Sequence, residues 1–198
     1  MMATRASHIL LVLSAFFAGL VVFLAVFLYA TGQFGDSGTS AVGGPFRLTD
    51  QNGKVITEAD FKGRPFLVFF GYTHCPDVCP TTLFDMSEVM RALGSDADRT
   101  AGLFISVDPD RDTPAVLKDY LSSFDPHLRG ATGDQAELSK VEKEYRVYAK
   151  KVPTGKNGDY SMDHSAIVYL MDKNGRFVAP FRLDRKPQDS AAELRKYL

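Results

Sequence analysis

Two thiols with a short, fixed spacing are the first candidates for chemistry in this sequence. Cys75 and Cys79 are separated by three residues in the stretch HCPDVCP (74–80), and the 198-residue chain has no other cysteine. Two cysteines are too few for a disulfide scaffold or for a zinc site with four thiolates. Thioredoxin-type redox motifs have two intervening residues, so the third one here widens the distance between the sulfurs. The wider spacing suits a metal ion, and it also allows a disulfide.

Pro80 indicates where the helix after the second cysteine begins. Proline fits the first turn of a helix and disfavours helical torsions in the residue before it. We therefore expect Cys79 to be the N-cap of a helix over Thr81–Leu93, in which apolar residues recur at helical spacing. A thiol at a helix N-terminus lies near the positive end of the helix dipole, which favours the thiolate that binds metals and attacks disulfides.

The elements that must position these thiols alternate between strands and helices from Phe46 onward. Continuous apolar runs predict buried strands over 65–71 and 103–107, and Asn-Gly turns predict hairpins over 46–57 and 166–183. Besides the helix after the cysteines, helices are expected over 114–124, 134–145 and 188–198. This order predicts an α/β thioredoxin-like fold, a central mixed sheet flanked by helices. The cysteines then lie where the first long strand leads into its helix.

A third metal ligand is expected, because two thiolates alone leave a copper ion exposed, and imidazole is a suitable donor beside soft sulfur. Of the four histidines, His8 precedes an apolar run and His127 follows Asp-Pro in a surface loop. His74 is adjacent to Cys75 and would point to the opposite face in an extended chain. His164 lies in a polar loop before a predicted strand, and the thioredoxin-like sheet would bring that loop near the cysteines. His164 is therefore the preferred third ligand.

Three motifs in this order resemble the SCO/SenC family. They are CPDVCP after one apolar strand, VDPDRDTP (107–114) after the next, and DHSAIVYL (163–170) near the C-terminus. Members of that family are membrane-anchored copper chaperones with a thioredoxin fold that serve cytochrome c oxidase. The likeness covers about residues 44–198.

The resemblance implies a ligand set and partners. Carried over by position, it implies that Cys75, Cys79 and His164 bind copper, as Cu(I) and also as Cu(II), and that the copper goes to the binuclear centre of oxidase subunit II. A thiol reductant and a copper donor would be further partners. The softness of two thiolates and one imidazole favours Cu(I) independently of the resemblance.

Carboxylates near these ligands are candidates for supporting roles. Asp163 precedes His164 and is placed to accept a hydrogen bond from its ring, although it would equally polarise a turn. Asp77, between the two cysteines, and Asp108, after the strand over 103–107, are assigned similar supporting positions.

The acidic stretch from Asp108 resembles the start of a calcium-binding loop. Asp108, Asp110 and Asp112 have the right spacing, but the sixth position is Thr113 instead of glycine and the twelfth is Asp119 instead of glutamate. We therefore reject calcium binding. A loop that shapes the copper site is the preferred interpretation, and a solvated helix start is the alternative.

The apolar residues gather in one long run near the N-terminus. Residues 9–30 carry no charge, and a helix of that length, rising about 1.5 Å per residue, crosses a hydrocarbon core of about 30 Å. Since Arg5 is the only basic residue before Arg47, the positive-inside rule places residues 1–8 in the cytoplasm. We expect a single inner-membrane anchor over 9–30 and a flexible linker over 31–43. The domain over 44–198 would then lie in the periplasm or the intermembrane space. A cleaved signal peptide is the alternative.

Charge and composition limit the other function classes. The chain has 23 basic and 24 acidic residues, which argues against a nucleic-acid partner and against an acidic disordered tail. A metallochaperone, which has no enzymatic turnover, is the first hypothesis. The alternative is a thiol-disulfide oxidoreductase that reduces the cysteines of the oxidase copper site or senses redox state, with Cys75 and Cys79 as its redox-active disulfide. His164 discriminates between them, because copper binding needs it and disulfide exchange does not.

Overall fold

The computed structural model describes residues 13–27, 42–155 and 158–198, and the chain divides into two compact units, Met1–Gly38 and Thr39–Leu198. In the first unit, residues 13–27 form a helix whose side chains are exposed. No helix in the described part of the chain has both the length and the apolar character that a membrane crossing requires. The predicted N-terminal segment over 1–8, both ends of the predicted anchor and most of the predicted linker lie outside the described residues.

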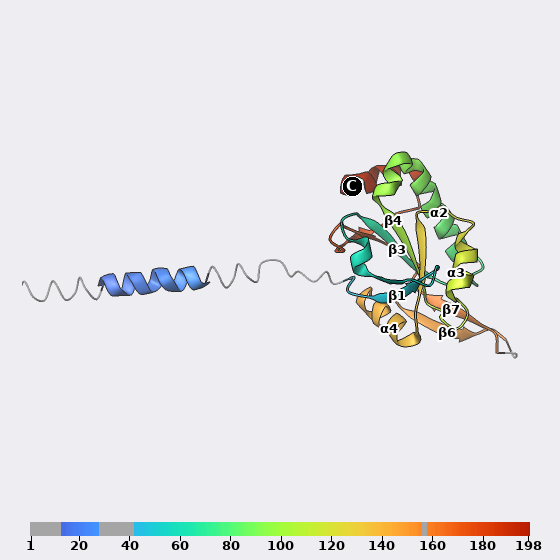
Figure 1. Ribbon diagram of the computed structural model, residues 1–198, viewed down its shortest axis with the longest axis horizontal. Coiled ribbons are helices and arrows are strands. Elements are labelled where there is room, and N and C mark those ends of the chain that lie inside the picture. Colours follow the sequence, from blue (N-terminus) through green and yellow to red (C-terminus); the bar gives the residue numbers. More distant parts are fainter. Residues whose placement is uncertain (1–12, 28–41, 156–157) are drawn as a thin grey trace, which may run out of the picture. The chain divides into compact units, whose positions relative to one another are not determined.

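A seven-stranded mixed sheet forms the centre of the second unit (Figure 1). Its strand order is β2-β1-β5-β4-β3-β8-β9. The three central strands run parallel to one another: β3 (Phe66–Gly71), β4 (Ala101–Ser106) and β5 (Leu128–Thr132). The outer strands are joined antiparallel: β1 (Arg47–Asp50), β2 (Val55–Thr57), β8 (Val168–Met171) and β9 (Phe177–Pro180). The predicted mixed sheet is thus confirmed.

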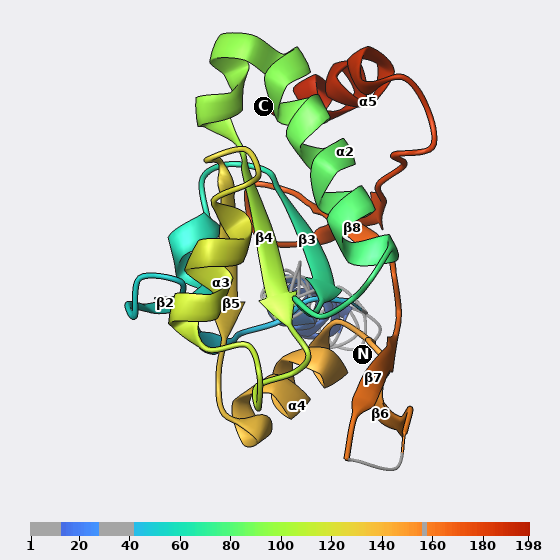
Figure 2. The same cartoon turned by 90° about the vertical axis from the view of Figure 1, so that its right-hand side faces the viewer.

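Helices cover both faces of this sheet. Every residue of β3 and β4 is buried, as their continuous apolar runs predict. On one face, Phe104 packs against Tyr120 of α3 (Pro114–Leu121), with 6.0 Å between ring centroids. On the other, Phe70 packs at 5.3 Å against Tyr145, which caps α4 (Gln135–Glu144). The long helix α2 (Val78–Leu93) lies beside α5 (Pro187–Leu194) (Figure 2).

The sequence does not predict β5, because LRGAT contains few strand-forming residues. The register sets Gly130 beside Phe104 and beneath α3. A Cβ atom on Gly130 would lie 2.6 Å from Leu121 Cδ1, so a larger residue there would displace the Leu121 side chain of the closely packed helix. Packing against α3 therefore stabilises residues 128–132 as a strand, although their intrinsic strand propensity is weak.

A separate hairpin of β6 (Ala149–Pro153) and β7 (Tyr160–His164) lies apart from the main sheet (Figure 2). The prediction of a loop around His164 is wrong, because His164 is the last residue of β7 and pairs with Ala149. The hairpin carries mostly polar side chains and only Met162 in β7 is buried, so the alternation that signals a half-buried strand is missing. Two strands alone are marginally stable, so the hairpin must be held by contacts with the domain.

His127 links the segment that precedes β4 to the segment that precedes β5. Its Nε2 lies 3.0 Å from Asp98 Oδ1 and its Nδ1 lies 2.7 Å from Asp125 Oδ1. The hydrogen bond to Asp98, together with that to Asp125, raises the pKa of His127, because both favour the charged ring. The sequence predicts that His127 lies in a surface loop. Its side chain is only 28% exposed, and its contact with Asp98 ties this loop to a neighbouring segment.

This arrangement predicts a specific pH dependence of stability. A raised pKa in the folded state means that the contribution of His127 is complete below its unfolded pKa of about 6.5 and is lost as pH rises through the folded value. We expect wild type to lose up to about 1 kcal/mol of unfolding free energy between pH 6 and pH 8 through this residue. His127→Gln should lack that part of the loss. Urea unfolding at several pH values measures it, and identical pH profiles for the two proteins would contradict the assignment.

Candidate metal centre

Cys75, Cys79 and His164 come together, although 85 positions separate Cys79 from His164. Cys79 Sγ lies 3.5 Å from His164 Nε2, and the three ligand atoms lie within 4.8 Å of one another. Both cysteines are free thiols. The three side chains could therefore hold one metal ion between them.

The thiols are placed by a turn and by the first turn of α2. The Cys75 N–H donates to Tyr72 O at 3.3 Å, and the Cys79 N–H points at Cys75 Sγ at 3.4 Å. The predicted N-cap is wrong, because α2 begins at Val78 with Asp77 as its N-cap. Cys79 therefore lies within the first helical turn. N–H groups of that turn have no acceptor inside the helix, so Pro80 costs no hydrogen bond there and the helix starts earlier than expected.

The two thiols differ in depth. Cys79 is fully buried, whereas Cys75 is half-buried. Burial raises the pKa of the Cys79 thiol above its usual value, although a backbone hydrogen bond from Tyr72 acts in the opposite direction. For Cys79, desolvation thus acts against the effect expected of the helix N-terminus.

Glycine is required where β3 reaches the thiol. A Cβ atom on Gly71 would lie 2.8 Å from Cys79 Sγ and equally close to a ring carbon of Phe104. The last residue of β3 must therefore be small for the sulfur to occupy its position against the sheet.

The His164 ring is oriented by one hydrogen bond and by edge-to-face contacts with Tyr72 and with Phe69, whose centroid lies 6.4 Å away. Its Nδ1 lies 3.2 Å from the Ser165 carbonyl oxygen, which can only accept, so Nδ1–H donates and the Nε2 lone pair faces Cys79. Tyr72 packs edge to face on the ring, with 5.7 Å between centroids. The Ser165 carbonyl is thus the acceptor for the His164 ring, the role that was predicted for the Asp163 carboxylate. Asp163 is exposed on β7.

Asp77 is likewise exposed, and its side chain makes no capping hydrogen bond to α2. The structure therefore sets two of the three predicted supporting carboxylates at the surface. The third is buried in the turn after β4.

Asp112, in that turn, holds the cysteine loop against the end of β4. Its fully buried carboxylate accepts from Thr73 N at 3.0 Å, from Thr73 Oγ1 at 2.6 Å and from Ser106 Oγ at 2.6 Å. Three donors from two elements thus converge on one side chain. The position of the loop that carries Cys75 depends on this carboxylate.

Asp108 and Arg111 hold the hairpin that carries His164. The Tyr160 hydroxyl donates to Asp108 Oδ1 at 2.7 Å, and the Arg111 guanidinium forms an ion pair with the same carboxylate. Arg111 Nη1 also donates to the Tyr160 carbonyl oxygen at 3.0 Å, and its guanidinium lies 3.8 Å from the centre of the Tyr160 ring. On the other side, Arg111 lies 5.7 Å from the Tyr72 ring. Tyr160 is the first residue of β7, so the turn holds one end of the strand and Tyr72 packs against the ring at the other.

Residues 108–112, called the brace below, therefore tie both parts of the site to the same turn. Asp108 and Asp112 were singled out from the sequence, in a loop expected to shape the copper site, but Tyr72, Arg111 and Tyr160 were not. The signal that could have found part of the set is the VDPDRDTP stretch, whose charged residues follow a buried strand.

The SCO1/SenC family model matches residues 35–198. The chain belongs to the SCO1/SenC family. It is 40% identical over 153 residues to an SCO2-like protein of Rickettsia felis, covering 75% of this chain and 73% of that protein. It is 41% identical over 163 residues to the mitochondrial protein SCO2 of Saccharomyces cerevisiae, covering 81% of this chain and 54% of that protein.

Solved structures of SCO1/SenC proteins share the fold. ScoI of Bradyrhizobium japonicum with copper bound is 66% identical, with a TM-score of 0.77, and the match covers 79% of this chain and 99% of that one. Yeast Sco1 with copper bound is 39% identical, with a TM-score of 0.72, and the match covers 79% and 87% of the two chains. The predicted α/β thioredoxin-like fold with its central mixed sheet is confirmed.

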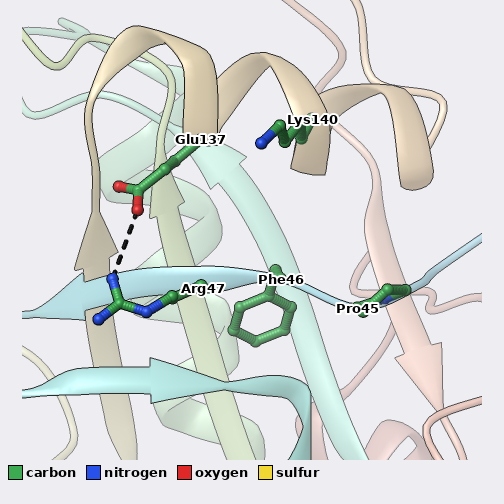
Figure 3. A pocket seen from close by; sticks show the side chains of 5 residues that line it. All are labelled: Pro45, Phe46, Arg47, Glu137 and Lys140. Carbon is green, nitrogen blue, oxygen red and sulfur yellow. Dashed lines mark ion pairs between the residues drawn. The ribbon is translucent and has the colours of Figure 1, made fainter.

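A cavity between β1 and α4 has a different character. It measures about 320 Å³ and is bordered by an ion pair of 3.6 Å between Arg47 and Glu137 (Figure 3). Pro45, Phe46 and Lys140 complete its lining. The lining offers neither a thiol nor an imidazole, so this cavity does not suit a soft metal ion.

The brace predicts a contrast between two carboxylates of the same turn. Asp112→Asn should lower the free energy of unfolding by about 1–3 kcal/mol, because an amide replaces a buried acceptor of three hydrogen bonds. Asp110→Asn removes only the exposed ion pair with Lys151 and should cost less than about 1 kcal/mol. Urea unfolding of the reduced proteins measures both. Equal losses in the two variants would show that the brace does not depend on Asp112.

Proposed function

We propose that this SCO1/SenC protein is a copper chaperone that binds Cu(I) through Cys75, Cys79 and His164. The observation that carries the proposal is the convergence of these three ligand atoms within 4.8 Å. Two thiolates and one imidazole form a soft donor set, which favours Cu(I) over hard cations such as Mg²⁺ or Ca²⁺. The copper-bound relatives of the same fold support this choice of metal.

Copper is the cargo of this site, and the small number of ligands allows the copper to be released. A site with three donors, of which the Cys75 sulfur is half-buried, leaves room for an incoming thiolate to attach to the ion. Ligands are then exchanged one at a time, and each departing thiolate of this chain takes up a proton. The copper keeps its oxidation state, so transfer of Cu(I) needs no electron carrier. The same ligands would hold the Cu(II) form.

The recipient in this proposal is the binuclear copper centre of cytochrome c oxidase subunit II. Membership of the SCO1/SenC family supports an oxidase partner. Delivery also requires a copper donor and a thiol reductant, since a dithiol outside the cytoplasm is otherwise oxidised.

The proposal places the domain beyond a membrane. Residues 9–30 would form a single-pass anchor with residues 1–8 in the cytoplasm, and residues 31–43 would tether the domain over 44–198 on the periplasmic or intermembrane-space side. The apolar, exposed side chains of the helix over residues 13–27 support this arrangement.

A thiol-disulfide oxidoreductase is the second candidate, favoured by two free thiols at short range. In that reaction the Cys75–Cys79 dithiol passes two electrons and two protons to a disulfide of the oxidase copper site. The dithiol becomes a disulfide, and the recipient becomes a dithiol ready for copper. His164 takes no part in this exchange, so it separates the two functions.

Copper binding is tested by ligand substitution. The reduced protein should bind one Cu(I), and Cys75→Ala, Cys79→Ala or His164→Ala should each weaken binding by at least about 100-fold, because each removes a donor. Anaerobic competition with a Cu(I) chelator measures the affinity. His127→Gln, which removes a histidine outside the site, should bind like wild type. Unchanged affinity in His164→Ala would contradict the three-ligand site and would favour the oxidoreductase.

The role in oxidase assembly is tested in the cell. Deletion of the gene should abolish most cytochrome c oxidase activity when copper is limiting, because subunit II then lacks an efficient copper source. Added copper should restore part of the activity. Oxidase activity is measured in membranes with and without copper supplementation, and normal activity under copper limitation would contradict the proposal.

A further inference from the structure

A second pocket has one wall on the helix that carries Cys79 and another on the segment that follows His164. It measures about 380 Å³. One wall is α2, where Thr82 and Asp85 follow Cys79 by three and six residues. The other wall is residues 166–168, which begin two residues after His164. The lining is completed by Phe181, Leu183 and Asp184. We call this the Asp85 pocket.

The floor of the Asp85 pocket is apolar. Val168 and Phe181 are buried beneath it, Leu183 is half-buried, and Ile167 is 43% exposed at its edge. An aliphatic chain lying on these side chains would be removed from water, at roughly 25 cal/mol for each Å² buried.

Asp85 is the carboxylate in this pocket that lacks a counterion. Burial and the nearby negative charge of Glu88 raise the pKa of Asp85. Glu88 itself forms an ion pair with Arg91, and Asp184 pairs with Arg182 at 3.0 Å. Within the part of the chain that the structure describes, no cation pairs with Asp85. A partly buried carboxylate above an apolar floor is suited to a long cationic side chain, which combines an aliphatic stem with a charged end.

Exposed apolar side chains flank the metal site as well. Val78, directly before Cys79, is 46% exposed, and Ile167 lies three residues after His164. Tyr148 is 53% exposed, and its carbonyl oxygen accepts from the N–H of the residue after His164. Exposed apolar side chains gathered beside a binding site are typical of a surface that another protein covers, so a protein is favoured over a free small cation as the occupant.

We propose that the Asp85 pocket receives a Lys or Arg side chain of the protein that accepts the copper, and so docks that protein beside the metal site. The stem of the side chain lies on Ile167, Phe181 and Leu183, and its charged group pairs with Asp85. This inference rests on the proposed function, because the partner is defined as the copper recipient. Since one wall follows Cys79 by less than two helical turns and the other begins two residues after His164, its occupant would lie close to the metal site.

The test compares charge changes inside and outside the pocket. The full chain, in detergent and loaded with Cu(I), is titrated with the reduced copper-binding domain of oxidase subunit II at low and high salt. Asp85→Asn should weaken binding on the order of 10-fold, because it removes a partly desolvated charge pair, and Asp85→Lys should weaken it further. Asp189→Asn, an equal charge change at an exposed position of α5, should bind like wild type.

Two controls separate docking from the metal site itself. All three variants should hold Cu(I) within about two-fold of wild type, since none alters a ligand. Asp85→Asn should also unfold at no lower urea concentration than wild type, because it relieves the repulsion by Glu88.

The outcomes distinguish this inference from the proposed function. Wild-type binding of subunit II by Asp85→Asn and Asp85→Lys would overturn the docking site and leave the chaperone intact. An equal loss in Asp189→Asn would also overturn it, as a general charge effect. Self-association of the chain that Asp85→Asn abolishes would assign the pocket to a second copy instead. A wild-type chain that holds Cu(I) but neither binds nor loads subunit II would overturn the recipient, and the docking proposal with it.

Discussion

The candidate metal centre depends on the buried carboxylates of one turn. Its thiols and its imidazole come from segments that do not pair with each other in a sheet, so backbone hydrogen bonds do not set the distance between them. The brace does so through side chains: Asp112 accepts from the cysteine loop, and Asp108 accepts from the hairpin that carries His164. Two charges buried in this way are tolerated because each carboxylate accepts hydrogen bonds or an ion pair from several donors, although Arg111 Nη2 has no partner among the described residues.

The main sheet fixes the position of the brace relative to the cysteine loop. The turn follows directly from β4, a strand buried on both faces, and the cysteine loop follows from the parallel neighbour β3. Their carboxyl ends therefore lie side by side at one edge of the sheet, where α/β proteins generally place their functional loops. The hairpin β6–β7 is attached to this edge by Tyr160, Arg111 and Tyr72, and so the imidazole reaches Cys79 from outside the sheet.

Local patterns in the sequence predict what is local in the structure. The buried strands β3 and β4 follow from apolar runs, and the two thiols and the imidazole from residue type, spacing and family resemblance. In contrast, β5 escapes prediction because Gly130 is selected by the helix above it. The pairs that build the brace, such as Tyr160 with Asp108, join residues tens of positions apart and leave no periodic signal. The Cys79 thiol shows the same limit, since its burial by the fold raises its pKa and the local pattern does not reveal that burial.

The unequal depth of the two sulfurs gives the site an inside and an outside. Any reagent that arrives from solvent, whether a thiolate, a disulfide or an oxidant, meets the half-buried Cys75 first, while Cys79 lies sealed beneath β3 and the His164 ring. In the proposed chaperone, the outer sulfur would then be the first to release the ion and the inner sulfur the last. The difference in burial would thus set the order of ligand exchange, with the deeper thiol retaining the ion until the exchange is complete.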